Sequence, residues 1–465
     1  MAATDAKSHR TFDTWIMCLA RWRGMDDSRF SAAYDRIDPI DKHGDRIHLA
    51  LGVFYCFFLG WPLSFVEIAA IPLGVCTAIR LWFNRRRLGL QFLMLPSVMF
   101  LCFWLWHTAA MMWAPDMTAA KEHGGRIRFA MSLLSLFPIV RYRTLLTLAI
   151  AAGFLCGVAS QAINAVGVWL DVPWLVVRDY AATGRNGGWW PEVVGGEILV
   201  AALGLHLPAA MLAGKVWGWK RLGAIAASVA TLVGIAATGT RGAWIAAAAL
   251  LTLGMVVAVA RLPTARLRVT LSALALGGVL VAGGIAGLTM GDSLTRRYTD
   301  ARNELVRMLE RGEYETNTGM RVKMIVWSWH AFTERPFTGI GVNGLRAHVL
   351  ASRTEATGRE LSVVEHFERE GHGHAHNSVM QLLATTGFPG LLFFVVGVAG
   401  SLWAGFLRLA PEEKGTYAEG AVWGLLGMLL IMPFDVVYIS AQPAAVFYVL
   451  LGLCPAWRPR SRLSM

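Results

Sequence analysis

The sequence predicts an all-α polytopic membrane protein with about twelve transmembrane helices, and three observations support this fold class. First, 55% of the 465 residues are hydrophobic, only 16% are charged, and the mean hydropathy is +0.48. Second, the apolar residues form recurrent runs of about 20 residues, the length that a helix needs to cross a bilayer. Third, these runs do not alternate apolar and polar residues over about ten positions, as transmembrane β-strands do.

The apolar runs define the expected spans in order along the chain. They cover 47–60, 63–83, 90–113, 127–140, 144–170, 191–213, 222–239, 242–260, 270–290, 376–407, 418–438 and 441–457. The first two runs are short and are joined by Gly60-Trp61-Pro62, so a re-entrant pair is an alternative for them. The tenth run contains Gly387-Phe388-Pro389-Gly390, which predicts a kink. Before the first span, residues 12–22 predict an amphipathic helix that lies on the membrane surface.

Basic residues predict the orientation. Most short loops rich in Lys and Arg fall on one side of the expected helices, and such loops are retained in the cytoplasm. Both termini are therefore expected there. Lys121, Arg126 and Arg128 fall on the opposite side and fit this orientation poorly. The net charge of +12 raises the question of nucleic acid, but the sequence has no soluble basic domain or binding motif, and basic loops beside anionic membrane lipids explain the charge better.

This topology divides the chain into five parts. They are a cytoplasmic segment (1–46), transmembrane helices one to nine (47–290), a periplasmic helical cap (291–375), transmembrane helices ten to twelve (376–457) and a cytoplasmic tail (458–465). Within the cap, Val322, Ile325, Trp329 and Phe332 recur at helical spacing and predict a helix with one apolar face. After the turn-rich stretch Arg335–Gly344, a further helix is expected at 344–358.

Three arginines occupy positions suited to binding an anion at the extracytoplasmic side. Arg241 interrupts two spans at their short turn, Arg185 precedes the helix that opens near Pro191, and Arg321 begins the amphipathic helix of the long loop. A guanidinium stays charged and can bind two phosphate oxygens at once, so several around one cavity would suit a diphosphate. The alternative is an interfacial anchor that reaches lipid headgroups, which is hardest to accept for Arg241. Glu192, Glu197 and Asp435 are acids on the same side that are available to pair with these arginines.

His372, His374 and His376 lie in a polar loop that runs into the tenth span. Imidazole moves protons near neutral pH, and a helix beginning at 376 would favour its neutral form, which a general base requires. Two alternatives remain for these histidines. One is helix capping or bonding to headgroups. The other is a metal site, for which the sequence fixes no carboxylate or thiolate partner. We expect no metal and no other cofactor.

Taken together, these motifs resemble the signature of the O-antigen ligase superfamily. The matching elements are Thr240-Arg241-Gly242, Arg321–Trp327 leading to Pro336–Gly341, and His374-Ala375-His376-Asn377-Ser378 followed by Gln381, Leu382 and Gly387. Their order, the many spans and the single large loop are also similar. The likeness extends over nearly the whole chain in architecture and is specific in sequence from about 180 to 390.

The resemblance implies an inner-membrane glycosyltransferase of the GT-C type whose active site faces the periplasm. Such a ligase transfers O-antigen from undecaprenyl diphosphate to lipid A–core oligosaccharide. Carried over by motif, His376 is similar to the family's essential histidine, and Arg241 and Arg321 to its essential arginines. We therefore expect catalytic roles for these three residues. Substrate contacts are expected from Arg185, whose correspondence is less clear, and from Asn377 and His374.

Other functions compete with this expectation. The same superfamily includes O-antigen polymerases and protein O-oligosaccharyltransferases, and the latter often carry a larger C-terminal periplasmic portion than this chain has. From a different class, a transporter or flippase of lipid-linked sugars would predict related halves and polar residues near the bilayer midplane. The charged candidates instead gather at one membrane face. A scaffold that uses the cap as a partner surface is a third alternative.

Overall fold

The computed structural model describes residues 41–88, 95–178, 184–212, 218–261, 299–407, 409 and 413–454. Every regular element in these ranges is helical, which confirms the all-α class. The expected surface helix at 12–22 and the expected span at 270–290 lie outside the described residues.

Six helical stretches in the described ranges are long and apolar enough to cross a membrane. They are Leu63–Phe83, Met117–Trp169, Glu192–Leu212, Trp219–Thr238, Arg241–Ala260 and Ser378–Phe406. Two shorter apolar helices, Tyr417–Ile431 and Ala441–Leu453, accompany them. The chain is thus a multi-pass helical membrane protein, while the full number of about twelve spans stays a prediction.

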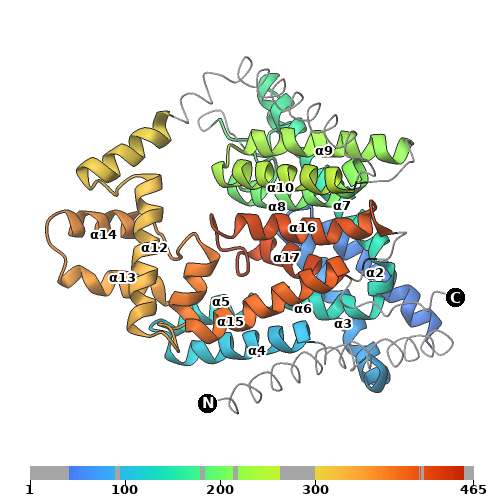
Figure 1. The fold of residues 1–465 in the computed structure, drawn as a ribbon, viewed down its shortest axis with the longest axis horizontal. Helices are drawn as coiled ribbons and strands as arrows, with labels where there is room; N and C mark the ends of the chain where they lie inside the picture. Colours follow the sequence, from blue (N-terminus) through green and yellow to red (C-terminus); the bar gives the residue numbers. More distant parts are fainter. Residues whose placement is uncertain are drawn as a thin grey trace, which may run out of the picture.

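The long helices run side by side in a bundle (Figure 1). The bundle contains α2 (Lys42–Phe58), α3 (Leu63–Leu88), α4 (Leu95–Ala109), α5 (Met117–Gly124), α6 (Ile127–Leu136), α7 (Arg143–Trp169), α8 (Glu192–Leu207), α9 (Trp219–Thr238), α10 (Arg241–Ala260), α15 (Ser378–Leu407), α16 (Tyr417–Ile431) and α17 (Ala441–Leu453). Short 3₁₀ turns cover Ala110–Trp113, Phe137–Tyr142 and Pro173–Leu175, and a π-helical turn, Pro208–Leu212, continues α8. Helices α7, α9 and α10 begin and end within three residues of the predicted spans.

Helix α8 lies at the centre of the bundle, buried along nearly its whole length. It packs against α16 through glycines that let the two backbones approach closely. A Cβ atom at Gly204 would lie 2.3 Å from the carbonyl oxygen of Trp423, and one at Gly420 would lie 2.5 Å from that of Leu205. Small residues at such crossings are typical of helix packing in membranes, where van der Waals contact drives association.

The predicted kink in α15 is confirmed at Gly387, whose φ of 66° and ψ of −170° are not helical. The turn-rich stretch that was predicted after residue 335 docks onto this kink. Ile340 donates its backbone N–H to the Ala384 carbonyl at 2.8 Å, and Phe388 donates to the Pro336 carbonyl at 2.8 Å. The docked turn thus satisfies backbone groups that the interrupted helix leaves free, which an apolar environment makes necessary.

Helices α12 (Asn317–Glu334), α13 (Gly344–Ala351) and α14 (Arg359–Arg369) form a separate group at one end of the bundle (Figure 1). They share a small core that includes Met324, Trp327, Leu345, Val364 and Phe367. The predicted amphipathic helix is present as α12, but the predicted apolar face is wrong: the helix buries Met320, Met324, Trp327 and Ala331 against its neighbours, whereas Trp329 is 49% exposed. The helix predicted at 344–358 is wrong in its second half, because α13 ends at Ala351 and a 3₁₀ turn, Ser352–Thr354, follows.

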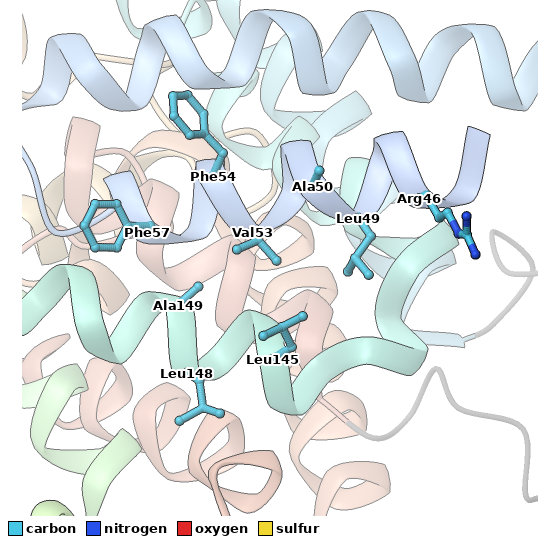
Figure 2. Close-up of a pocket in the computed structure, with 9 residues that line it drawn as sticks. All are labelled: Arg46, Leu49, Ala50, Val53, Phe54, Phe57, Leu145, Leu148 and Ala149. Atoms are coloured by element: carbon cyan, nitrogen blue, oxygen red, sulfur yellow. The ribbon is translucent and has the colours of Figure 1, made fainter. Parts of the chain in front are cut away.

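An apolar groove runs between α2 and α7 (Figure 2). Carbon-rich side chains line it, with the guanidinium of Arg46 at one end; the others are Leu49, Ala50, Val53, Phe54, Phe57, Leu145, Leu148 and Ala149. Although it is roomy, it lies among membrane helices away from the histidines and contains no group that could carry chemistry. Its place and its apolar lining suit contact with lipid.

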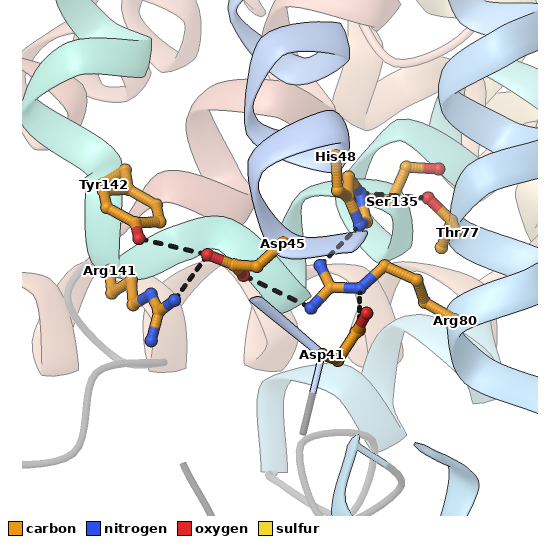
Figure 3. A network of polar contacts seen from close by, with 8 residues as sticks. All are labelled: Asp41, Asp45, His48, Thr77, Arg80, Ser135, Arg141 and Tyr142. Carbon is orange, nitrogen blue, oxygen red and sulfur yellow. Dashed lines mark hydrogen bonds and ion pairs between the residues drawn. The ribbon is translucent and has the colours of Figure 1, made fainter. Parts of the chain in front are cut away.

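Ion pairs fill the end of the bundle near Arg46 (Figure 3). Arg80 donates to Asp41 at 2.8 Å and to Asp45 at 3.2 Å, and Arg141 and Tyr142 also donate to Asp45. Two further arginines of the short basic loops also pair with acids: Arg143 pairs with Glu413, and Arg261 pairs with Glu419. Since helices of about 20 residues are about 30 Å long, this end lies far from the one that carries Arg241.

Candidate functional site

The histidine loop is fixed where it enters α15. The side chain of Asn377 caps the helix, because its Oδ1 accepts the N–H of Met380 at 3.0 Å. Gln381 reaches back and accepts the backbone N–H of Ala375 at 2.9 Å. The expected helix start at 376 is therefore wrong by two residues, and His376 lies before the helix with a positive φ of 46°.

The other end of the loop is held by α13. Arg346 donates through Nη1 to the carbonyl of His372 at 2.8 Å and through Nη2 to the carbonyl of Glu368 at 3.3 Å. Both ends of the histidine loop are thus bonded to helices. This fixes the loop relative to the α12–α14 group.

A non-helical segment, 432–440, faces the histidine loop. The predicted span 418–438 is wrong in its last third, because α16 ends at Ile431. Pro433 follows at once and cannot supply a helical N–H. The side-chain amide nitrogen of Asn377 also holds this segment, because Nδ2 donates a hydrogen bond to the Pro433 carbonyl at 3.2 Å.

Ser378 locks the segment to the start of α15. Its N–H donates to the Met432 carbonyl at 2.8 Å, and its hydroxyl donates to the Asp435 carbonyl at 2.7 Å. The same hydroxyl oxygen accepts the N–H of Val437 at 3.1 Å. These bonds place the Asp435 side chain beside the histidines.

Two imidazoles converge on the carboxylate of Asp435. His376 Nδ1 lies 3.4 Å and His374 Nε2 lies 3.6 Å from the same oxygen, Oδ1. Burial lowers the pKa of His376, although hydrogen bonding to Asp435 opposes this. Burial alone would raise the pKa of Asp435, but hydrogen bonding to His374 and His376 holds it well below its ordinary value. The resting pair is therefore a neutral imidazole facing a carboxylate.

Arg321, in the first turns of α12, reaches the same segment. Its Nη1 donates to the carbonyl of Phe434, the residue before Asp435, at 2.5 Å. Its positive charge also acts on His376 and on Glu197, an α8 carboxyl that bonds to Asp435. Helices α8 and α12 and the histidine loop thus each contribute a charged or titratable group to this point.

Arg241, the first residue of α10, lies beside this cluster. Its Nη1 is 3.6 Å from Glu304 Oε2, and Glu304 also accepts the N–H of Thr318 at the start of α12. The next residue, Gly242, touches the Phe434 side chain so closely that an added Cβ would lie 2.7 Å away. The turn that carries Arg241 therefore contacts the segment that carries Asp435.

Arg185 packs against the same turn. Its Nε donates to the Thr238 carbonyl at 3.1 Å, and its Nη2 donates to the Thr240 hydroxyl at 3.3 Å. That hydroxyl in turn donates to the carbonyl of Glu192, at the start of α8. Arg185 thus joins the beginning of α8 to the turn of Arg241.

The structure therefore gathers the sequence-predicted residues in one region at the end of the bundle beside α12–α14. His374, His376 and Arg321 surround the segment of Asp435, Asn377 caps the adjoining helix, and Arg241 and Arg185 share the neighbouring turn. His374 and His376, with Asp435, are also the described residues that could hold a metal ion.

Two acids have partners that the sequence did not reveal. Asp435 was one of three acids available to the arginines, whereas the structure turns its side chain toward the histidines. Glu304, which pairs with Arg241, lies in no motif that would mark it in the sequence. The sequence does contain a sign that Asp435 is functional. It lies within an apolar stretch, where a carboxylate is costly and usually has a functional partner.

Comparison with known protein families identifies part of the chain. A sequence model of the O-antigen ligase family matches residues 226–395, which contain Arg241, Arg321 and the histidine loop. Arg185 and Asp435 fall outside the matched residues. No curated protein matches the chain. The match confirms the resemblance over residues 226–395, where the chain is similar to the O-antigen ligase family.

Proposed function

We propose that this protein is an O-antigen ligase of the bacterial inner membrane. It would transfer O-antigen polysaccharide from undecaprenyl diphosphate to lipid A–core oligosaccharide at the periplasmic face, with α12–α14 as the periplasmic cap. One observation carries the proposal: a buried carboxylate, Asp435, faces His376 at 3.4 Å, and Arg321 is bonded to the adjoining residue.

His376 serves as the general base in this proposal. Asp435 accepts the Nδ1 proton, which fixes the tautomer and leaves the Nε2 lone pair for the acceptor. The 3.4 Å separation is long for a hydrogen bond, but catalytic bonds often shorten only when substrate is bound. His376 removes the proton from an acceptor hydroxyl as its oxygen attacks the anomeric carbon. The bond from that carbon to the diphosphate breaks, so one displacement inverts the configuration.

The arginines bind and stabilise the leaving diphosphate. The guanidinium of Arg321 bonds to the segment 432–440, and Gly242, the residue after Arg241, packs against the same segment. The two arginines thus come from neighbouring helices, and in this proposal they bind one anion between them. Arg185 supports the Arg241 turn and adds a third positive charge. Cationic donors aimed at developing charge lower the barrier. Because the donor is already an activated diphosphate, no nucleotide is consumed.

Asn377 and His374 complete the proposed substrate contacts. His374 is the more exposed of the two histidines that face Asp435, with 36% of its side chain accessible. It is placed to meet a sugar hydroxyl at the entrance. Asn377 holds the histidine loop through its cap and its bond to Pro433, and it lies within one residue of the base.

Purified components provide the test. The full chain, in detergent or vesicles, is incubated with undecaprenyl-diphosphate-linked O-antigen and lipid A–core, and the joined product is followed as a size shift on a gel. Formation of that product supports the proposal. Lengthened donor without joining would indicate a polymerase, and movement of donor across vesicles without bond formation would indicate a flippase; either result would overturn it.

A further inference from the structure

The three side chains at the proposed base have the geometry of a metal site. The nearest donor atoms of His374, His376 and Asp435 all lie within 4.8 Å of one another, and both nitrogens are within 3.6 Å of Asp435 Oδ1. Zinc binds His nitrogen at about 2.0–2.1 Å, so tetrahedral geometry separates its donor atoms by roughly 3.3 Å. The two distances to Asp435 Oδ1, 3.4 and 3.6 Å, are slightly longer than this separation, so a small movement of the side chains would let all three bind one ion.

The chemistry of the donors also favours a zinc-like ion. Two imidazoles and one carboxylate suit zinc and its transition-metal neighbours, whereas magnesium and calcium prefer oxygen alone. His376 Nδ1 is buried and faces Asp435 Oδ1 at 3.4 Å, a separation that is long for a hydrogen bond. His374 is partly exposed, which gives an ion a way in from the surface.

We propose that His374, His376 and Asp435 bind a Zn²⁺ ion that inhibits the protein. A metal on Nδ1 of His376 leaves the ring proton on Nε2, so that nitrogen can no longer accept a proton. The ion also occupies the carboxylate that orients the imidazole. Inhibition by this ion rests on the proposed ligase function, whereas the binding site does not.

The surroundings predict reversible binding. Arg321 places a positive charge near the three donors and opposes a dication. Three protein ligands leave a fourth position for water. The site should therefore release its ion to a chelator.

Zinc binding is tested on the purified full chain without substrate. The protein carries a purification tag that contains no histidine, is stripped with chelator and is titrated with Zn²⁺ against a chromophoric zinc chelator. We expect the unaltered protein to bind one zinc ion at this site. His374→Gln and Asp435→Asn should bind that ion at least about tenfold more weakly than the unaltered protein, as for other disturbed metal sites. Thermal melting confirms that each variant is folded.

His372→Gln is the matched control. The ring of His372 lies 5.7 Å from that of His376, yet it supplies none of the three donor atoms. This variant should bind zinc as the unaltered protein does. Equal binding by His374→Gln and the unaltered protein, or an equal loss in His372→Gln, would overturn the site.

The inhibition is tested by measuring ligation activity at a series of buffered free Zn²⁺ concentrations. Activity should fall over the zinc concentrations that fill the site, return with chelator, and be unaffected by Mg²⁺. Full activity at saturating zinc would refute inhibition while leaving the ligase proposal intact. Activity that requires zinc would refute both inhibition and the base assignment. Zinc binding that depends on His374 in a protein without ligase activity would support the site and refute the proposed function.

Discussion

At the scale of single residues, His376 adopts a backbone conformation that side-chain-bearing residues rarely take, with a φ of 46°. Such strain persists only where the surroundings impose it, and it concentrates at functional sites. Here the Asn377 cap and the bond from Ala375 to Gln381 impose it. This backbone conformation directs the imidazole of His376 toward Asp435.

Removing the proposed base should reduce ligation activity with little change in the amount of folded protein. We expect His376→Ala to lower turnover by about 10²–10⁴-fold, the usual contribution of a general base. Asp435→Asn should also be strongly impaired, because an amide can present its N–H₂ to Nδ1 and favour the wrong tautomer. Ligation is measured in cells at matched protein level. Near-normal ligation by His376→Ala would refute the base assignment.

Arginine should not be replaceable by lysine at the proposed diphosphate site. Arg241→Lys keeps the charge but loses the planar fork, so we expect ligation to fall by about 10²-fold, as when one oxyanion donor is removed. Arg128→Lys is the control, because Arg128 is largely exposed and pairs with Glu67. Equal activity of the two variants would exclude a bidentate role for Arg241.

At the scale of elements, the turn at Gly339 is built for glycine. Its φ is +63°, and an added Cβ would lie 2.4 Å from the Thr385 backbone. Gly339→Ala should therefore destabilise the protein by about 1–3 kcal/mol from backbone strain, with a further cost from the clash. Gly223→Ala in α9 has no neighbour within 4 Å and should be neutral or stabilising. Thermal melting in detergent measures both, and similar melting temperatures would show that the turn is not constrained.

The elements that were predictable differ from the rest in how they are stabilised. Helices α7, α9 and α10 could be predicted because their apolar length alone indicates a membrane span. Helix α14 was not predicted, since its charged sequence forms a helix only by burying Val363, Val364 and Phe367 against its neighbours. The position of Asp435 could not be predicted either. It depends on bonds to Ser378, a residue distant in sequence.

At the scale of the whole molecule, the two ends of the bundle carry different groups. One end holds Arg80, Arg141, Arg143 and Arg261, each paired with an acid, and the other holds the proposed site, where Arg241 pairs with Glu304. The basic loops predict that the end with Arg80 is cytoplasmic.

Labelling with a membrane-impermeant thiol reagent tests this orientation. In a cysteine-free background, Glu355→Cys, an exposed position between α13 and α14, should react in spheroplasts. His43→Cys, exposed at the start of α2, should react only after the membrane is permeabilised. The reverse pattern would place the site in the cytoplasm and contradict the proposed function.

Asp435 lies outside residues 226–395, although Ser378, which holds it in place, lies inside them. This separation limits how the proposed catalyst can be re-engineered. A chimera that exchanges only the recognisable family region between two such proteins would import a foreign histidine and keep the native acid. Successful hybrids should therefore have a crossover point beyond residue 440, so that the acid and the base are inherited from one parent.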